Sequence, residues 1–271
     1  MNPHINSLIR GSAAYPTGYS SITEIDGKHS EALLDFGILV LDAGERFSDR
    51  NDERERAYLL IDGAAELCHQ GGRVEAVRRS VLDEGPWTLH VSAGEEIEIL
   101  AASRCELAVE MVRNDARFDP IVYSPTDSRS ERFGAGTMQE TSTRTVRTVF
   151  DASTHPDSGM VLGEVINHPG KWSSYPPHSH AHPEIYHYRL FPEQGFGFSQ
   201  VGDNVHHITT GDTVVIPGGV PHPQVAGPGY VMYYLWMIPH LPGNRFGPDS
   251  RIFDEQHTWM TTPDAAIWPD R

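Results

Sequence analysis

Short apolar stretches, many of them alternating with polar residues, recur along both halves of the chain and end at turns rich in glycine or proline. In the first half they are "FGILVLDAGERF" (36–47), "RAYLLIDGAAELCH" (56–69), "WTLHVSAGEEIEILAA" (87–102) and "CELAVEMV" (105–112). In the second half they are "GMVLGEVINHPGKWSSYPPHSH" (159–180), "EIYHYRLFPEQGFGFSQVG" (184–202), "GDTVVIPGGVPHPQV" (211–225) and "GYVMYYLWMI" (229–238). Such stretches are typical of strands, broken here by Asp-Gly or Ala-Gly turns. We therefore predict an all-β chain in which a long helix cannot be placed.

The second half repeats the layout of the first about 125 residues later. "LVLDAGERF" aligns loosely with "EVINHPGKW", and "ERAYLLIDGAAEL" aligns with "PEIYHYRLFPEQGFGF". This repeat predicts two tandem β-sandwich or jelly-roll barrel modules, each of which closes its own sheet edges. One continuous large sandwich is the alternative.

A polar segment rich in Ser, Thr, Asp and Arg lies between the two repeats, at 113–145. Such a composition is typical of a surface connection, so we interpret it as a linker. The predicted domains are 1–143, the N-terminal module with the linker, and 144–271, the C-terminal module with a tail.

The chain has 37 acidic and 21 basic side chains, and its formal net charge is −16. This charge would repel a nucleic-acid backbone or an anionic membrane, so we expect neither as a partner. An acidic small molecule would need a local positive site, such as a bound cation. The chain has no long apolar run and no signal-peptide pattern at its start, so we expect a cytoplasmic protein. Cys68 and Cys105 are expected to be reduced thiols.

One stretch, "YPPHSHAHPEIYHY" (175–188), places four of the fifteen histidines within ten residues, around one glutamate. If the segment is extended, His178, His180 and Glu184 point to the same side. His222, just after a Pro-Gly-Gly turn, is a fourth candidate. Three imidazoles and one carboxylate suit one divalent transition metal, namely Zn, Mn, Fe, Co or Ni. The alternative is a chance cluster of histidines in an exposed loop.

Two motifs in this region resemble those of the cupin family. "HSHAHPE" resembles the first cupin motif, and "GDTVVIPGGVPH" resembles the second, in the correct order and on predicted strands. Further segments, "GKWSSYPPHSH", "EIYHYRLFPEQGFGF", "GYVMYYLWM" and "FDEQHTW", resemble the 5-deoxy-glucuronate isomerase family of bacterial inositol catabolism, which is related to 5-keto-4-deoxyuronate isomerase. The likeness is best between residues 144 and 259.

The resemblance implies a bicupin fold, in which only the C-terminal domain holds a metal. The N-terminal half has no His-x-His, because "ERFSDRNDERERAYLL" fills the matching place. The resemblance therefore implies a degenerate N-terminal cupin with a structural or oligomer-forming role, and a homo-oligomer as the assembly. The short "AHP" between the second motif histidine and the glutamate departs from the longer insert of the family.

The activity that the resemblance implies is aldose–ketose isomerisation of a sugar acid or deoxy sugar acid, specifically 5-deoxy-glucuronate to 5-dehydro-2-deoxy-gluconate. A divalent ion bound to the carbonyl and the neighbouring hydroxyl would stabilise the negative charge of an enediolate. Two alternatives stay open: a mononuclear non-haem iron cupin dioxygenase, and a non-catalytic sugar-binding cupin.

The residues expected to act on the substrate are less well specified than the metal ligands. Glu184, Tyr186 and Tyr188 have the same parity on one predicted strand, so all three are candidate catalytic residues, although a tyrosine in a core is equally common. The candidate substrate-binding residues are Lys171, Gln200, Tyr234 and Trp236. Lys171 or Arg189 could hold the carboxylate of the substrate, or either could be an ordinary surface charge.

Overall fold

The computed structural model describes residues 7–262 and 264–269. Within these residues the only helices are five 3-10 turns of three residues each, and all other regular elements are strands. The turns are η1 (Ser30–Ala32), η2 (Met138–Glu140), η3 (Pro248–Ser250), η4 (Glu255–His257) and η5 (Trp259–Thr261). The all-β prediction is confirmed.

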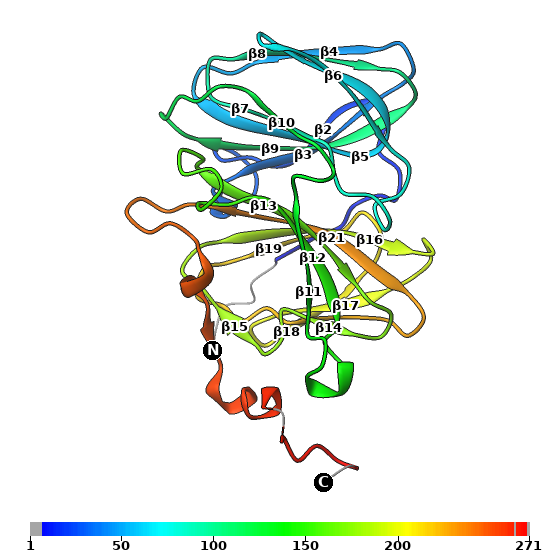
Figure 1. The fold of residues 1–271 in the computed structure, drawn as a ribbon, viewed down its shortest axis with the longest axis vertical. Coiled ribbons are helices and arrows are strands. Elements are labelled where there is room, and N and C mark those ends of the chain that lie inside the picture. Colours follow the sequence, from blue (N-terminus) through cyan, green and yellow to red (C-terminus); the bar gives the residue numbers. More distant parts are fainter. Residues whose placement is uncertain (1–6, 263, 270–271) are drawn as a thin grey trace.

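The first half of the chain forms one sheet with the order β10-β7-β5-β9-β3-β2, to which β4, β6 and β8 are attached. Figure 1 shows this first module in blue to green. Its strands are β2 (Gly18–Thr23), β3 (Asp35–Leu41), β4 (Arg46–Arg50), β5 (Arg54–His69), β6 (Gly72–Arg78), β7 (Thr88–Val91), β8 (Glu96–Ala101), β9 (Cys105–Arg113) and β10 (Ile121–Tyr123).

The second half forms a sheet with the order β1-β19-β16-β21-β13-β12-β11 and a smaller one with the order β14-β20-β17-β18. The strands of the larger sheet are β1 (Leu8–Ile9), β11 (Arg129–Phe133), β12 (Arg144–Phe150), β13 (Met160–Asn167), β16 (Glu184–Phe191), β19 (Thr213–Ile216) and β21 (Val231–Pro239). The others are β14 (Trp172–Ser173), β17 (Gly197–Val201), β18 (Asn204–Ile208) and β20 (Gln224–Ala226), with the pair β15 (His178–Ser179) and β22 (Ile252–Phe253). In Figure 1 this module lies below the first, and the C-terminal tail extends away from it.

Alternation along the strands divides the apolar side chains among three cores. Tyr58 and Leu60 point into the core of the first module, whereas Ala57 and Leu59 point into an apolar layer shared by both modules. In the second module, Tyr186 lies in its own core. Because successive side chains of a strand face opposite sides, the two large sheets pack back to back through the shared layer. Each module therefore also keeps a core of its own on the other face of its large sheet.

A buried ion network also joins the two modules. The Glu164 carboxylate, fully buried, accepts hydrogen bonds from Arg78 at 2.7 and 2.9 Å, from Arg147 at 2.7 Å and from the Tyr233 hydroxyl at 2.8 Å. Arg78 comes from the first module, and the other three residues come from the second. Because a buried charge is tolerated only when it is paired and hydrogen-bonded, this network ties the two sheets in one arrangement.

The segment 113–145, predicted to be a linker, contains two strands, because β10 pairs with β7 and β11 pairs with β12. One sequence interpretation needs correction. The Asp62-Gly63 pair is not a turn, since β5 continues through it with a shift in register. Gly63 has a φ of +96°, and a Cβ there would lie 2.3 Å from the Arg104 carbonyl oxygen. Only glycine fits this bend.

The division into 1–143 and 144–271 stays a prediction. Strand pairing crosses it twice, because β1 pairs with β19 and β11 pairs with β12. β1 and β11 thus lie before residue 144 but belong to the large sheet of the second module.

Candidate metal site and its cavity

Three of the predicted ligands meet inside the second module. One potential ligand atom from each of His180, Glu184 and His222 lies within 4.8 Å of the other two. The Nε2 atoms of His180 and His222 are 3.2 and 3.3 Å from the same carboxylate oxygen, Oε2 of Glu184. All three residues are at least 96% buried, with exposed fractions of 3%, 4% and 1%. This set is a buried trio consistent with a cupin metal site.

The Pro-Gly-Gly turn explains how His222 reaches the other two residues. A Cβ at Gly218 would lie 2.1 Å from the Ala181 carbonyl oxygen, so only glycine lets the turn lie directly on the histidine segment. Gly219, with a φ of +80°, donates its backbone N–H to the His180 carbonyl at 2.6 Å. His222 follows three residues later and is thereby fixed beside His180.

The hydrogen bonds of the three motif histidines indicate their tautomers. Nδ1 of His178, His180 and His222 lies 3.1, 3.0 and 2.8 Å from the backbone carbonyl oxygens of Pro176, His182 and Val220. A carbonyl can only accept, so each Nδ1 carries the proton and each Nε2 keeps a lone pair. This is the arrangement in which a histidine binds a metal through Nε2.

The charge of Glu184 is consistent with a cation at this place. Burial would raise the pKa of Glu184, but protons on the imidazoles of His180 and His222, in the place that a metal ion would take, outweigh burial and lower the pKa below its usual value. A buried carboxylate and two nitrogen lone pairs that face one another repel unless a positive charge lies among them. The residues present therefore fit a divalent transition metal.

His178 lies beside the trio and not within it. Its ring centroid is 5.0 Å from that of His222 and 6.4 Å from that of His180. Burial lowers its pKa to about 3, so its ring is neutral. The parity argument also needs correction, because β15 ends at Ser179 and β16 begins at Glu184, so the segment is not one continuous strand. His178 as a fourth ligand stays a prediction.

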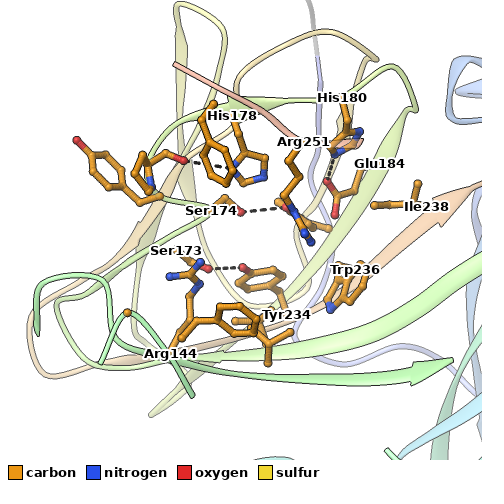
Figure 2. A pocket seen from close by; sticks show the side chains of 18 of the residues that line it. Arg144, Ser173, Ser174, His178, His180, Glu184, Tyr234, Trp236, Ile238 and Arg251 are labelled. Atoms are coloured by element: carbon orange, nitrogen blue, oxygen red, sulfur yellow. Dashed lines mark hydrogen bonds and ion pairs between the residues drawn. The ribbon is translucent and has the colours of Figure 1, made fainter. Parts of the chain in front are cut away.

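A cavity of about 260 Å³ opens beside the trio. Tyr186, Tyr234 and Trp236 line it, as the sequence led us to expect. The Tyr234 hydroxyl is 2.6 Å from the Ser173 hydroxyl, and the Tyr186 hydroxyl is 3.1 Å from that of Ser174 (Figure 2). The Trp236 Nε1–H is buried without a hydrogen-bond partner among the described residues. The cavity thus offers several polar groups to a polyhydroxylated ligand.

The other predicted site residues lie elsewhere. The Tyr188 hydroxyl donates to Gln224 at 2.6 Å within the core, so this residue is a satisfied core tyrosine. Gln200 lines a separate surface pocket, together with Trp172 and Tyr175. Lys171 is not among the residues that line either of these two pockets.

Arg189, the other cation that the sequence offered for the carboxylate, does not face the cavity. It pairs with Glu106 of the first module, because it points from β16 to the side opposite Tyr186 and Tyr188. This pairing leaves it no part in the lining.

Two arginines that line the cavity were missed by the sequence interpretation. Arg144 is the first residue of β12, and Arg251 lies in the tail between η3 and β22. Neither belongs to a motif or has a characteristic spacing to the histidines. The only available signal was that both fall within the region of family likeness.

A sequence profile described as the KduI/IolB family matches residues 8–260. The chain belongs to the KduI/IolB family. Relatives of this KduI/IolB chain include the 5-deoxy-glucuronate isomerase of Geobacillus thermodenitrificans, 28% identical over 248 residues that cover 82% of this chain and 88% of that protein. The 5-deoxy-glucuronate isomerase of Bacillus subtilis is 25% identical over 237 residues, which cover 80% and 86% of the two chains. The predicted family is confirmed.

Solved structures support the bicupin fold of this family member. An IolB-like protein from Salmonella typhimurium superposes with a TM-score of 0.80 at 23% identity, covering 94% of this chain and 99% of that one. An oxalate decarboxylase from Lactobacillus farciminis superposes with a TM-score of 0.67 at 14% identity, covering 93% and 90%. In the part of the chain that the structure describes, no helix has the length and apolar character needed to cross a bilayer.

Proposed function

We propose that this protein isomerises 5-deoxy-glucuronate to 5-dehydro-2-deoxy-gluconate. The observation that carries the proposal is the buried trio His180, Glu184 and His222, which adjoins a cavity lined by hydroxyls. Relatives that match over about four fifths of this chain are named 5-deoxy-glucuronate isomerase. An acidic six-carbon sugar is a substrate of the size and polarity that such a cavity takes.

The proposed metal ligands are His178, His180, Glu184 and His222, and the metal is one of Zn, Mn, Fe, Co and Ni. A divalent ion held there supplies a Lewis acid for the negative charge that develops on the sugar oxygens. The backbone carbonyls that accept from the three Nδ1–H groups keep the imidazoles oriented.

Glu184 is our candidate for the group that moves the proton between the two adjacent carbons. It is the single carboxylate among the residues that line the cavity. Both imidazoles approach Oε2, and no hydrogen bond among the described residues uses Oε1. One oxygen that removes a proton from one carbon and returns it to the next is sufficient for an aldose–ketose isomerisation.

Tyr186 is our candidate for a hydrogen-bond donor to the reacting oxygens. Burial, together with the nearby Glu184 carboxylate, raises its pKa well above 10. Burial likewise raises the pKa of Tyr234 to about 12. Both phenols therefore keep their protons at neutral pH and can donate to an oxygen on which negative charge develops.

The test is to incubate metal-loaded protein with 5-deoxy-glucuronate in D2O and to follow product and deuterium incorporation by NMR. We expect 5-dehydro-2-deoxy-gluconate with deuterium at the carbon that gains the proton. The rate should be the same without oxygen, unlike that of a dioxygenase. If neither product nor deuterium exchange is observed, 5-deoxy-glucuronate is excluded as the substrate. Binding without conversion at full metal content would favour a sugar-binding role instead.

A further inference from the structure

Two guanidinium groups face the cavity without a carboxylate partner. Figure 2 shows Arg251 reaching in from the side of the histidines and Arg144 from the side of Tyr234. Both line the cavity, and no carboxylate of the described residues lies within 4.0 Å of either one. Arg144 is half-buried and Arg251 is exposed. The buried arginines among the described residues are paired, as Arg78 and Arg147 are with Glu164. In a chain with a net charge of −16, two unpaired cations at one cavity mark a place for an anion.

Existing contacts position both arginines but leave donors free. Nη1 of Arg144 donates to the backbone carbonyl and the hydroxyl of Ser142, at 2.9 and 3.0 Å, and its guanidinium lies 5.6 Å from the Phe133 ring centroid. The Arg251 guanidinium lies 5.3 Å from the Phe246 ring centroid. Rings beneath a guanidinium fix its plane and leave its edge available for a planar carboxylate.

The two cations are close enough to affect each other. Burial lowers the pKa of Arg144, and the positive charge of Arg251 lowers it further. Bringing two like charges to one partly buried place is unfavourable until an opposite charge binds between or beside them. An anionic ligand would therefore relieve the repulsion between the two guanidinium groups.

We propose that Arg144 and Arg251 form the carboxylate subsite of this cavity and hold the acid end of the sugar substrate. This inference rests on the proposed function for the identity of the substrate. Arg144 lies across the cavity from Glu184 in Figure 2, so a sugar acid would be held at both ends. The carbonyl end faces the histidine and glutamate trio, and the carboxylate end faces the arginines.

The position of Arg251 adds a link between the tail and the cavity. β22, directly after Arg251, pairs with β15, so that Phe253 lies opposite His178 and their ring centroids are 5.4 Å apart. The backbone N–H of Asp254 donates to the Pro177 carbonyl at 2.8 Å. The tail segment that carries Arg251 is thus anchored on the histidine segment, which holds Arg251 at the cavity.

Binding of non-reacting ligands tests this subsite without any turnover. We would titrate metal-loaded protein calorimetrically with gluconate and with its neutral counterpart glucitol. The wild type should prefer gluconate. Arg144→Met and Arg251→Met should each weaken gluconate binding about 10- to 100-fold, the usual loss when one hydrogen-bonded charge partner is removed. Glucitol binding and metal content should not change.

Two further variants separate recognition from structure and from bulk charge. Arg144→Lys keeps the charge and should retain part of the preference for gluconate. Arg132→Met removes an exposed arginine from neighbouring β11, outside the cavity, and should bind gluconate as the wild type does. A preference for gluconate that survives in both Arg144→Met and Arg251→Met, or that is missing from the wild type, overturns the subsite.

The outcome is distinguishable from failure of the proposed function. If gluconate binding depends on the two arginines but 5-deoxy-glucuronate is not converted, the subsite stands and the assigned substrate is wrong. If 5-deoxy-glucuronate is converted and neither substitution changes KM, the function stands and the subsite is wrong.

Discussion

The two modules carry buried residues of opposite charge at corresponding strand positions. Arg56 of β5 lies opposite Val91 of β7, as Glu184 of β16 lies opposite Ile216 of β19. Arg56 is fully buried and donates to Asp49 at 2.8 Å and to the Glu95 carbonyl. The first module therefore contains its own cation, a guanidinium, where the second places a carboxylate.

The difference gives a physical reason why this place in the second module is suited to a metal and the corresponding place in the first is not. In the first, Arg56 and Asp49 neutralise each other, and the Tyr58 hydroxyl also donates to Asp49. In the second, the Glu184 carboxylate and the Nε2 atoms of two imidazoles face one another, and no arginine or lysine side chain of the described residues belongs to this group. Because a buried charge needs a partner, the arrangement in the second module is suited to a cation taken from solution. In the same scaffold, a buried arginine thus supplies the positive charge in the first module, whereas a buried glutamate makes the second module suited to a metal ion.

The largest expected effect is on metal content. His222→Ala and His180→Ala should each lower metal affinity by at least about 100-fold and abolish isomerisation, because each removes a buried Nε2 beside Glu184. Elemental analysis of the purified variants measures this. His207→Ala, which changes an exposed histidine stacked on Phe196, is the control and should keep its metal. If His178→Ala keeps full metal content, His178 is not the fourth ligand.

In the first module, Arg56→Ala should lower the free energy of unfolding by about 2–4 kcal/mol. The substitution leaves Asp49, whose side chain is 23% exposed, and the Tyr58 hydroxyl without their cation. Urea denaturation measures the loss. Arg46→Ala, which breaks the exposed pair with Glu98, should cost less than about 1 kcal/mol. A loss of bound metal from folded Arg56→Ala protein would contradict the independence of the two sites.

The two modules also offer a matched pair of tyrosines, Tyr58 and Tyr186, each two residues after the position just compared. Tyr186→Phe should lower kcat about 100-fold, since it removes a donor that lines the cavity. Tyr58→Phe should lower stability by about 1–2 kcal/mol through its lost hydrogen bond to Asp49 and leave kcat unchanged. Steady-state kinetics on both variants checks this. Equal losses of kcat would mean that Tyr186 acts through the fold and not on the substrate.

Local sequence patterns were enough for part of this picture. Alternation predicted the strands and the all-β class, and the motif spacing predicted four metal ligands, of which the structure brings His180, Glu184 and His222 together. Neither could identify Arg144 and Arg251, because the tail and β12 meet the histidine segment only through tertiary packing. Strand parity alone would have excluded Arg189, which has the opposite parity to Glu184 on the same strand. Lys171 lies outside the strands, where no such period applies. The bend at Asp62-Gly63 was misread because a bulge and a turn use the same residues.

The smallest expected effect concerns the shared apolar layer, where the modules differ at one matched position. Glu110 lies opposite Ala57 of β5, as Met237 lies opposite Ile185 of β16. Glu110 is fully buried, and neither carboxyl oxygen has a hydrogen-bond partner among the described residues. Burial raises its pKa well above the usual value. The nearby titratable groups include Tyr19, whose own pKa is raised by burial and then by Asp35 and Glu110.

Because the folded-state pKa of Glu110 is raised above its unfolded value, its contribution to stability is fully present below about pH 4.5 and is lost as the pH rises toward the folded pKa. Glu110→Met and Glu110→Gln both remove this titration. Relative to each variant, the wild type should therefore lose unfolding free energy as the pH rises from 5 to 7. Urea unfolding of the three proteins at several pH values measures the difference. A gap between wild type and Glu110→Gln that stays constant with pH would mean that Glu110 finds a charge partner in the folded protein, and that this layer is less apolar than its counterpart around Met237.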